Sequence, residues 1–271
     1  MTSAKLPELR PEYDPTRATL HAYAKAMGAI AREHGIPHPK WWHISLNVRP
    51  EGLTTDPIPL PDGGALAVTM DLKRHEIVLR ASSGEDHRID IGAEPTATDV
   101  GESLIAAAAG LGLEDRYERD RFDNDDPRKY DPTAAAAYYD TFVAVASIFE
   151  RRRASLGERV GPVQVWPHGF DLAFEWFGTR TEMDGDDEAT AQLNLGLYPG
   201  GDQAYFYSTP WPFDPAVTEA SLPGDARWNT DGWNGGLLPY ESARNAEDPA
   251  ATITQFAVAV FEAARPSLET T

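Results

Sequence analysis

Two histidines in this sequence end short segments that resemble each other, and histidine is the side chain that most readily exchanges a proton near neutral pH. His43 ends the segment WWH at 41–43, and His168 ends the segment WPH at 166–168. Two carboxylates follow the second histidine closely, and a carboxylate can orient an imidazole that acts as a general base. The candidate catalytic residues are therefore His43, His168, Asp171 and Glu175.

A second set of polar and aromatic residues alternates with apolar residues along segments that we expect to be strands. Such side chains make directional hydrogen bonds to a neutral or weakly charged ligand. Two other interpretations stay open: the side chains satisfy one another where two lobes meet, or they form a plain solvated sheet face. The candidate ligand-binding residues are Trp41, Ser45, Asn47, Gln192, Asn194, Tyr205, Tyr207, Trp211 and Trp233.

The spacing of metal-binding and cofactor-binding residue types gives no strong motif. A site of two histidines and a carboxylate is conceivable, but the sequence has no close His-x-His or His-Glu-x-x-His pattern. Because the chain has no cysteine, thiolate metal sites, disulfides and a cysteine nucleophile are excluded. Gly235-Gly236 lacks the context of a phosphate loop, and no Gly-x-Ser-x-Gly elbow occurs. We expect no metal and no cofactor.

The charge balance restricts the partners. The chain has 43 acidic against 24 basic residues and a formal net charge of −19, which repels nucleic acid and anionic membranes. No apolar run is long enough to span a bilayer, and the first residues contain no signal-peptide pattern. We therefore expect a cytoplasmic protein whose partner is a small-molecule ligand, with neither nucleic acid nor membrane as a partner. The oligomeric state is not specified by the sequence.

The first half of the chain predicts helices at both ends of a group of strands. A helical repeat runs from Thr16 to His34, and a strictly alternating pattern from Trp41 to Val48 predicts a strand. Two further strands are predicted at Ala65 to Leu72 and Glu76 to Ala81, joined by a polar turn. A second helix is predicted to begin after a capping Thr96 or Thr98 and to continue through Ala109.

The second half repeats this order. A long helix is predicted from Pro132 to Gly157, followed by alternating strands at Phe170 to Phe177 and Gln192 to Tyr198. A third strand is predicted at Ala204 to Ser208, and a closing helix at Pro249 to Ala264. Between this strand and this helix, the segment from Pro210 to Pro239 is aromatic and rich in Gly and Pro. Such a segment is typical of either a functional lid or irregular packing.

These patterns predict an α+β fold of two similar lobes, each with helices packed on an antiparallel sheet. The charged stretch between Glu114 and Pro132 marks the boundary, so we expect an N-terminal lobe at 1–120 and a C-terminal lobe at 121–271 that form one compact unit. The repeated order and the paired WWH and WPH segments fit an internal duplication and a chance match equally well.

Several motifs resemble those of an uncharacterised bacterial protein family, a domain of unknown function. They are WWHISLNVRPEGLTT at Trp41 to Thr55, VWPHGFDLAFEWF at Val165 to Phe177 and YFYSTPWPF at Tyr205 to Phe213. In that family an Asn precedes the paired tryptophans and a second His often follows Pro-His, whereas here Lys40 and Gly169 stand at those places. The resemblance implies a coherent fold over most of the chain, makes a metal site less favoured and adds no activity.

The leading hypothesis is a small-molecule enzyme or ligand-binding protein with a polar and aromatic cleft, in which histidine and carboxylate perform acid–base chemistry. The rival hypothesis is an interaction or scaffold protein that docks a partner on its tryptophan-rich loop. Exposure distinguishes them: a docking surface places Trp211, Trp228 and Trp233 in one exposed apolar patch, whereas in an enzyme they line the rim of a pocket.

Overall fold

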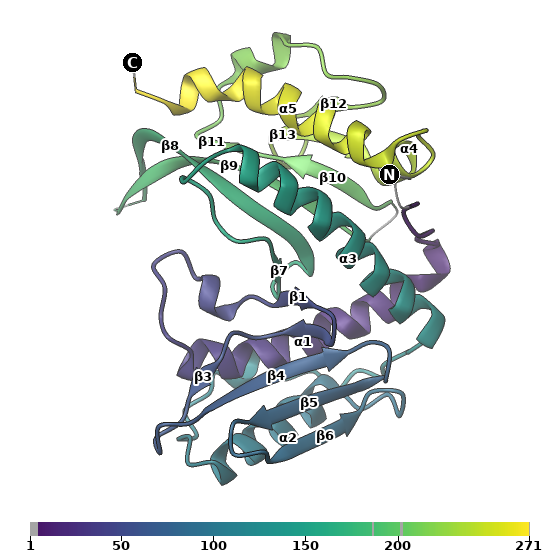
Figure 1. Ribbon diagram of the computed structural model, residues 1–271, viewed down its shortest axis with the longest axis vertical. Coiled ribbons are helices and arrows are strands. Elements are labelled where there is room, and N and C mark those ends of the chain that lie inside the picture. The colour runs from purple at the N-terminus through teal and green to yellow at the C-terminus, as the bar shows by residue number, and fades with distance from the viewer. Residues whose placement is uncertain (1–4, 186, 201–202, 271) are drawn as a thin grey trace. The chain divides into compact units, whose positions relative to one another are not determined.

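The computed structural model describes residues 5–185, 187–200 and 203–270, and confirms the α+β class. The described chain forms two compact units, each with helices and an antiparallel sheet (Figure 1). We call residues 9–143 and 164–171 the first-sheet unit, and residues 5–8, 144–163 and 172–270 the second-sheet unit. Each unit is described by itself.

The first-sheet unit contains a six-stranded antiparallel sheet with the order β1-β2-β4-β5-β6, in which β3 also pairs with β4. Its strands are β1 (Asn47–Arg49), β2 (Gly52–Thr54), β3 (Ile58–Pro59), β4 (Ala65–Asp71), β5 (Glu76–Ala81) and β6 (Asp86–Asp90). The two strands predicted as a hairpin are confirmed as β4 and β5, with Asp71 opposite Glu76 beside the turn. The prediction missed the shorter strands and the charged β6.

Helices α1 (Asp14–His34) and α2 (Ala97–Gly110) supply the apolar cover of this unit. Leu20, Tyr23 and Met27 recur at helical spacing along α1 and are fully buried, and burying each such side chain contributes about 1.5–3 kcal/mol. The Thr96 side chain accepts from the Asp99 N–H while the Asp99 carboxylate accepts from the Thr96 N–H, so α2 begins with a capping box. Both predicted helices, and Thr96 as the cap, are confirmed.

The second-sheet unit contains the longer strands. The seven-stranded sheet has the order β12-β13-β10-β9-β8-β7, with β11 paired to β9. Its edge strand β7 belongs by residue number to the first-sheet unit. The strands are β7 (Gln164–Trp166), β8 (Asp171–Asp184), β9 (Asp187–Tyr198), β10 (Tyr205–Ser208), β11 (Pro210–Trp211), β12 (Arg227–Asn229) and β13 (Gly235–Pro239). The helices of the second half are α3 (Pro132–Ser155), α4 (Tyr240–Arg244) and α5 (Pro249–Leu268).

Alternation holds along β8 and β9 as the sequence predicts. Leu172, Phe174 and Trp176 are buried on one face, opposite Leu197, Leu195 and Leu193 in the register. This apolar face packs against helices, and the rings of Trp176 and Phe261 of α5 meet edge to face with centroids 4.9 Å apart. The opposite face carries the polar and aromatic side chains.

The predicted strand from Trp41 to Val48 is wrong. Residues Trp42–Ile44 form a 3-10 turn called η2, and only Asn47 to Arg49 is extended. Local hydrogen bonds compete with the strand here: the Ser45 hydroxyl donates to the Trp42 carbonyl at 2.7 Å, and the His43 ring accepts from the backbone. Four consecutive residues, 43–46, are buried, so the alternation in sequence does not become an alternation of faces.

The charged segment that we expected to separate the lobes lies within the first-sheet unit. Its aromatic residues Tyr117 and Phe122 are buried, and the ring of Phe122 lies against Gly101 of α2. The change from one unit to the other falls inside α3, between residues 143 and 144. The two sheets differ in strand number and order, and an internal duplication stays a hypothesis.

Candidate functional site

The first-sheet unit contains a pocket of about 410 Å3 in which basic side chains predominate. Three cations, one carboxylate and one imidazole supply its polar lining, and the apolar part comes from small and aliphatic residues. The polar residues are Lys25, Arg32, Asp120, Arg121 and His168. A volume of this size suits a small molecule.

One face of α1 forms a long side of the pocket. Lys25, Gly28 and Arg32 recur at intervals of three and four residues, so they lie one above another on the helix. His21 occupies the preceding position of the same stripe. The opposite face of α1 carries the buried apolar residues, and the amphipathic pattern of the helix therefore fixes which side faces the pocket.

Gly28 allows the close approach that shapes the pocket floor. A Cβ atom at this position would lie 3.2 Å from Cγ and 3.3 Å from Cβ of Pro167. The absence of a side chain thus lets the WPH segment pack directly on the helix backbone.

The two tryptophan–histidine segments meet at this pocket. Leu46 and Val165 exchange two backbone hydrogen bonds, each 2.8 Å long. Ile44 and Pro167, two residues from this bridge on each side, both line the pocket. The WWH and WPH segments, which resemble each other in sequence, are thus followed or joined by residues that line the same pocket.

A tight turn presents His168. The Phe170 amide donates to the Trp166 carbonyl at 2.7 Å, and Phe170 has a φ of 56°, which is unusual for a bulky residue. His21 of α1 donates from Nε2 to the His168 carbonyl oxygen at 3.0 Å. The turn is thus tied to the helix by its backbone, while the His168 side chain stays exposed at the pocket.

The electrostatics of the pocket favour a negatively charged ligand. In the part of the chain that the structure describes, neither Lys25 nor Arg32 forms an ion pair, whereas Arg121 pairs with Glu118 at 2.5 Å. Burial and the neighbouring Arg121 charge lower the pKa of Arg32. Burial and the Lys25 charge lower the pKa of His21 to about 4. Positive charges therefore meet here without full compensation by carboxylates.

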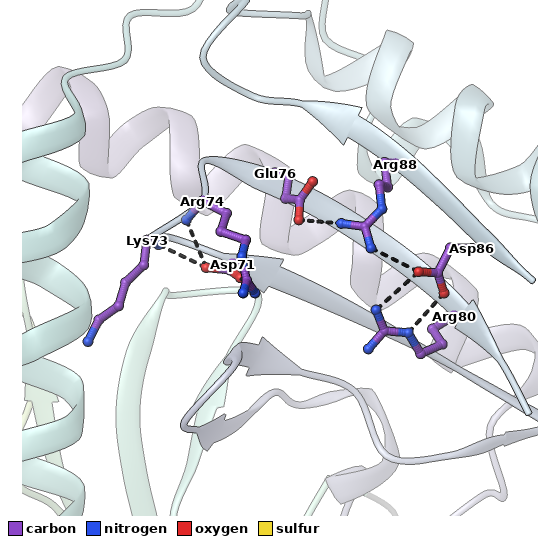
Figure 2. Close-up of polar contacts among 7 residues, drawn as sticks. All are labelled: Asp71, Lys73, Arg74, Glu76, Arg80, Asp86 and Arg88. Atoms are coloured by element: carbon purple, nitrogen blue, oxygen red, sulfur yellow. Dashed lines mark hydrogen bonds and ion pairs between the residues drawn. The ribbon is translucent and has the colours of Figure 1, made fainter. Parts of the chain in front are cut away.

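A second charged pocket, of about 370 Å3, lies on the open face of the first sheet. Its arginine side chains are paired with carboxylates, unlike Lys25 and Arg32 within the described residues (Figure 2). There Arg80 pairs with Asp86 at 2.8 Å, and Arg88 bridges Asp86 and Glu76. The hydrogen bond from Arg80 holds the pKa of the Asp86 carboxyl below its usual range. Because its arginines are paired with carboxylates, this surface has little excess charge to offer an anion.

His43 is 8% exposed, and its contacts are those of a neutral packed imidazole. Its Nδ1 accepts from the His38 amide at 3.2 Å, and burial and the nearby Arg32 charge lower its pKa. Ser45 is buried with its hydroxyl bound to the Trp42 carbonyl. Asn47 donates to the Asp56 carboxylate at 3.0 Å. Of the predicted residues in the WWH segment, only Trp41 is exposed.

Asp171 lies at the start of β8 and is half-buried. A Cβ on Gly169 would be 2.6 Å from the Asp171 Oδ1 atom, so the carboxylate lies over the backbone next to His168. Glu175, four residues farther along β8, belongs to the second-sheet unit and is opposite Asn194.

The other predicted ligand-binding residues share the polar face of the second sheet. Asn194 uses Oδ1 to accept from the Thr209 amide at 2.9 Å, which fixes the neighbouring strand. Tyr205 stacks on Trp233 with centroids 5.9 Å apart, and the Tyr207 ring covers Gly196. Gln192 is opposite Trp211 in the register. These residues form a half-buried polar and aromatic face, and their convergence with His43 and His168 stays a prediction.

The tryptophan-rich segment is not an exposed apolar patch. Trp211, Trp228 and Trp233 are half-buried, and Trp228 donates from Nε1 to the Ala220 carbonyl at 2.8 Å. The exposure expected of a docking surface on these three residues is therefore absent from the structure.

Two features are absent from the described residues. No group of three or more His, Asp or Glu side chains in the described ranges is placed to hold a metal ion. No helix in the described part of the chain has the length and hydrophobicity of a membrane span.

Sequence reasoning missed the basic side of the pocket. In the sequence, the apolar repeat of α1 is its most regular feature, and the charged segment around Arg121 resembles a boundary between lobes. The signal was present as His21, Lys25, Gly28 and Arg32 at helical spacing, a polar stripe opposite the apolar one.

Comparison with known proteins identifies a family but no activity. Neither curated proteins nor solved structures give a significant match to the chain. A family model matches residues 6–269, nearly the whole sequence, and the expected membership of a family of unknown function is confirmed. The chain belongs to the family of unknown function DUF5996.

Proposed function

We propose that this protein binds a small anionic molecule in the pocket of the first-sheet unit, with His168 as the acid–base group beside it. The observation that supports the proposal most strongly is the meeting of Lys25, Arg32 and Arg121 in one pocket of a chain whose net charge is −19. An acidic protein spreads its surplus of carboxylates over its surface, so a pocket with more cations than carboxylates needs a specific reason.

The charge of the pocket also gives the ligand its binding energy. A guanidinium or ammonium that hydrogen-bonds an anion contributes about 1.5–3 kcal/mol, since the bond is charge-assisted. Lys25 and Arg32 form no competing ion pair within the described residues, so an anion does not have to displace a carboxylate from them. Bound charge also relieves the repulsion between Arg32 and Arg121.

His168 is the best-placed of the two candidate histidines for proton transfer. It is exposed at the pocket, whereas the His43 ring is buried and accepts a backbone hydrogen bond at Nδ1. Asp171, whose carboxylate lies over Gly169, is the candidate to orient the His168 ring. The proposed enzyme function rests on these two residues, and the ligand-binding function rests on the cations.

Isothermal titration with inorganic phosphate and acetate at constant ionic strength tests the binding. Lys25→Ala and Arg32→Ala should each weaken the affinity about ten-fold or more, as expected for the loss of one charge-assisted bond. Arg80→Ala is the matched control, because it removes an arginine from the paired surface of the same unit. If Arg80→Ala weakens binding as much as Arg32→Ala, general attraction rather than this pocket explains the binding.

A further inference from the structure

Trp41 is 52% exposed, a large value for an aromatic residue of this size. Its φ of 60° lies in the left-handed region, which bulky residues seldom adopt. The Trp41 amide donates to the His38 carbonyl at 2.8 Å and the Trp41 carbonyl accepts from the Ile44 amide at 3.2 Å. Local hydrogen bonds thus hold the backbone in a costly conformation that keeps the indole in solvent.

Two neighbours orient the exposed ring. The guanidinium carbon of Arg32 lies 4.8 Å from the ring centre of Trp41, and the His43 ring is stacked at 5.6 Å with 23° between the planes. Arg32 also lines the basic pocket. The indole thus contacts a cation that lines the pocket and that forms no ion pair within the described residues, although Trp41 itself is not a lining residue.

We infer that the ligand of this pocket is a planar aromatic molecule bearing an anionic group, whose ring stacks on Trp41 while its anion binds Arg32 and Lys25. The inference rests on the proposed anion-binding function and names its ligand class. Arg32 and His43 contact part of the indole, and the remaining exposed half of Trp41 offers apolar surface to a second ring. Stacking of that ring contributes beyond simple burial. A carboxylate and a phosphate both satisfy the cations, so the ring is the distinguishing feature.

Four probes separate the two parts of the ligand in titrations at constant ionic strength. Benzoate is compared with cyclohexanecarboxylate, which has the same charge and a similar ring without π electrons. Phenyl phosphate is compared with inorganic phosphate. We expect each aromatic probe to bind about five-fold more tightly than its partner, the gain of one aromatic pair. The two pairs also show whether the pocket prefers a carboxylate or a phosphate.

Variants of Trp41 locate the effect. Trp41→Leu should abolish the preference of each aromatic probe over its non-aromatic partner, a ratio measured within the same variant, whereas Trp41→Phe should keep most of that preference. Ile36→Ala is the control, because Ile36 is also a large exposed apolar residue but has no aromatic ring. Circular dichroism of each variant checks that the fold is retained.

The outcomes are distinguishable. If wild-type protein binds all four probes with no preference for the aromatic ones, the aromatic ligand class is wrong and the anion pocket stands. If Trp41→Leu keeps the preference, stacking on Trp41 is likewise wrong. If none of the four probes binds, both this inference and the proposed function are overturned.

Discussion

His21 donates a hydrogen bond from Nε2 to the carbonyl oxygen of His168, 3.0 Å away, and so links α1 to the WPH turn. The ring is half-buried, and burial together with the Lys25 charge lowers its pKa from 6.5 to about 4. The hydrogen bond to the His168 carbonyl partly offsets this shift, because a charged imidazolium donates the stronger bond. Burial and the Lys25 charge outweigh the hydrogen bond, so His21 is held in its neutral form near neutral pH.

The first prediction concerns pH. The unfolded chain binds a proton on His21 near pH 6.5, and the folded chain only near 4. The stability that depends on a neutral His21 is therefore fully present above pH 6.5 and is lost as the pH falls toward 4. After allowance for partial exposure, the loss is about 1–2 kcal/mol. Urea unfolding of wild type and His21→Gln on both sides of this window should show the smaller loss in the variant. An equal loss in both proteins contradicts the prediction.

The second prediction concerns the pocket floor. In Gly28→Ala, the new methyl group pushes on Pro167, and anion affinity should fall several-fold as the WPH turn moves. Stability should change by less than about 1 kcal/mol, because the gain in helix propensity offsets the tight contact. Gly110→Ala in α2 is the control, since nothing lies within 4 Å of its Cβ position. Titration and denaturant unfolding measure both quantities, and unchanged affinity in Gly28→Ala counts against this role of Gly28.

The third prediction concerns the support of Arg121. Its neighbour Phe122 is 2% exposed, and a Cβ on Gly101 would be 2.2 Å from the Phe122 ring. Phe122→Leu leaves part of this space empty, so both stability and anion affinity should decrease, the former by about 1–2 kcal/mol. Arg121→Ala should lower affinity with little change in stability. If Phe122→Leu loses stability but binds anions as wild type does, Phe122 does not position Arg121.

The fourth prediction concerns the second sheet. A Cβ on Gly196 would lie 2.1 Å from Cζ of Tyr207, so Gly196→Ala must displace that ring and should cost about 1–3 kcal/mol. Tyr207→Ala removes the clashing ring. In the double variant the alanine at 196 should therefore cost much less than in the wild-type background, which a double-mutant cycle by denaturant unfolding measures. Additive effects of the two substitutions would show that the ring does not cover Gly196.

Regular patterns in the sequence were sufficient for the long elements. The apolar repeat of α1 predicts the observed helix, and the alternation along β8 that puts Leu172 and Phe174 on one face predicts the observed strand. In both, a buried face imposes its period on the residues. The same alternation misleads at Trp41 to Val48. There the Ser45 hydroxyl and the His43 ring bind nearby backbone groups and stabilise a turn, an effect that hydrophobic periodicity does not detect.

The candidate site was predicted only in part. His168 and Trp41 follow from the motifs. His168 lines the pocket, and Trp41 contacts Arg32, which also lines it. Lys25 and Arg32 share a helix face whose spacing is visible in the sequence, but Arg121 reaches the same pocket through contacts of Phe122 that are distant along the chain. Local patterns cannot report such non-local packing.

The bridge between Leu46 and Val165 joins positions about 120 residues apart, and it has a consequence for fragments of this protein. A polypeptide that stops before Gln164 retains every basic residue of α1 yet lacks Pro167 and His168, so it possesses the charges without the floor beneath them. Closing the loop between Leu46 and Val165 costs conformational entropy, so this contact is expected to form late in folding. If the pocket binds an anion as proposed, binding therefore requires a chain that has been synthesised and folded past His168.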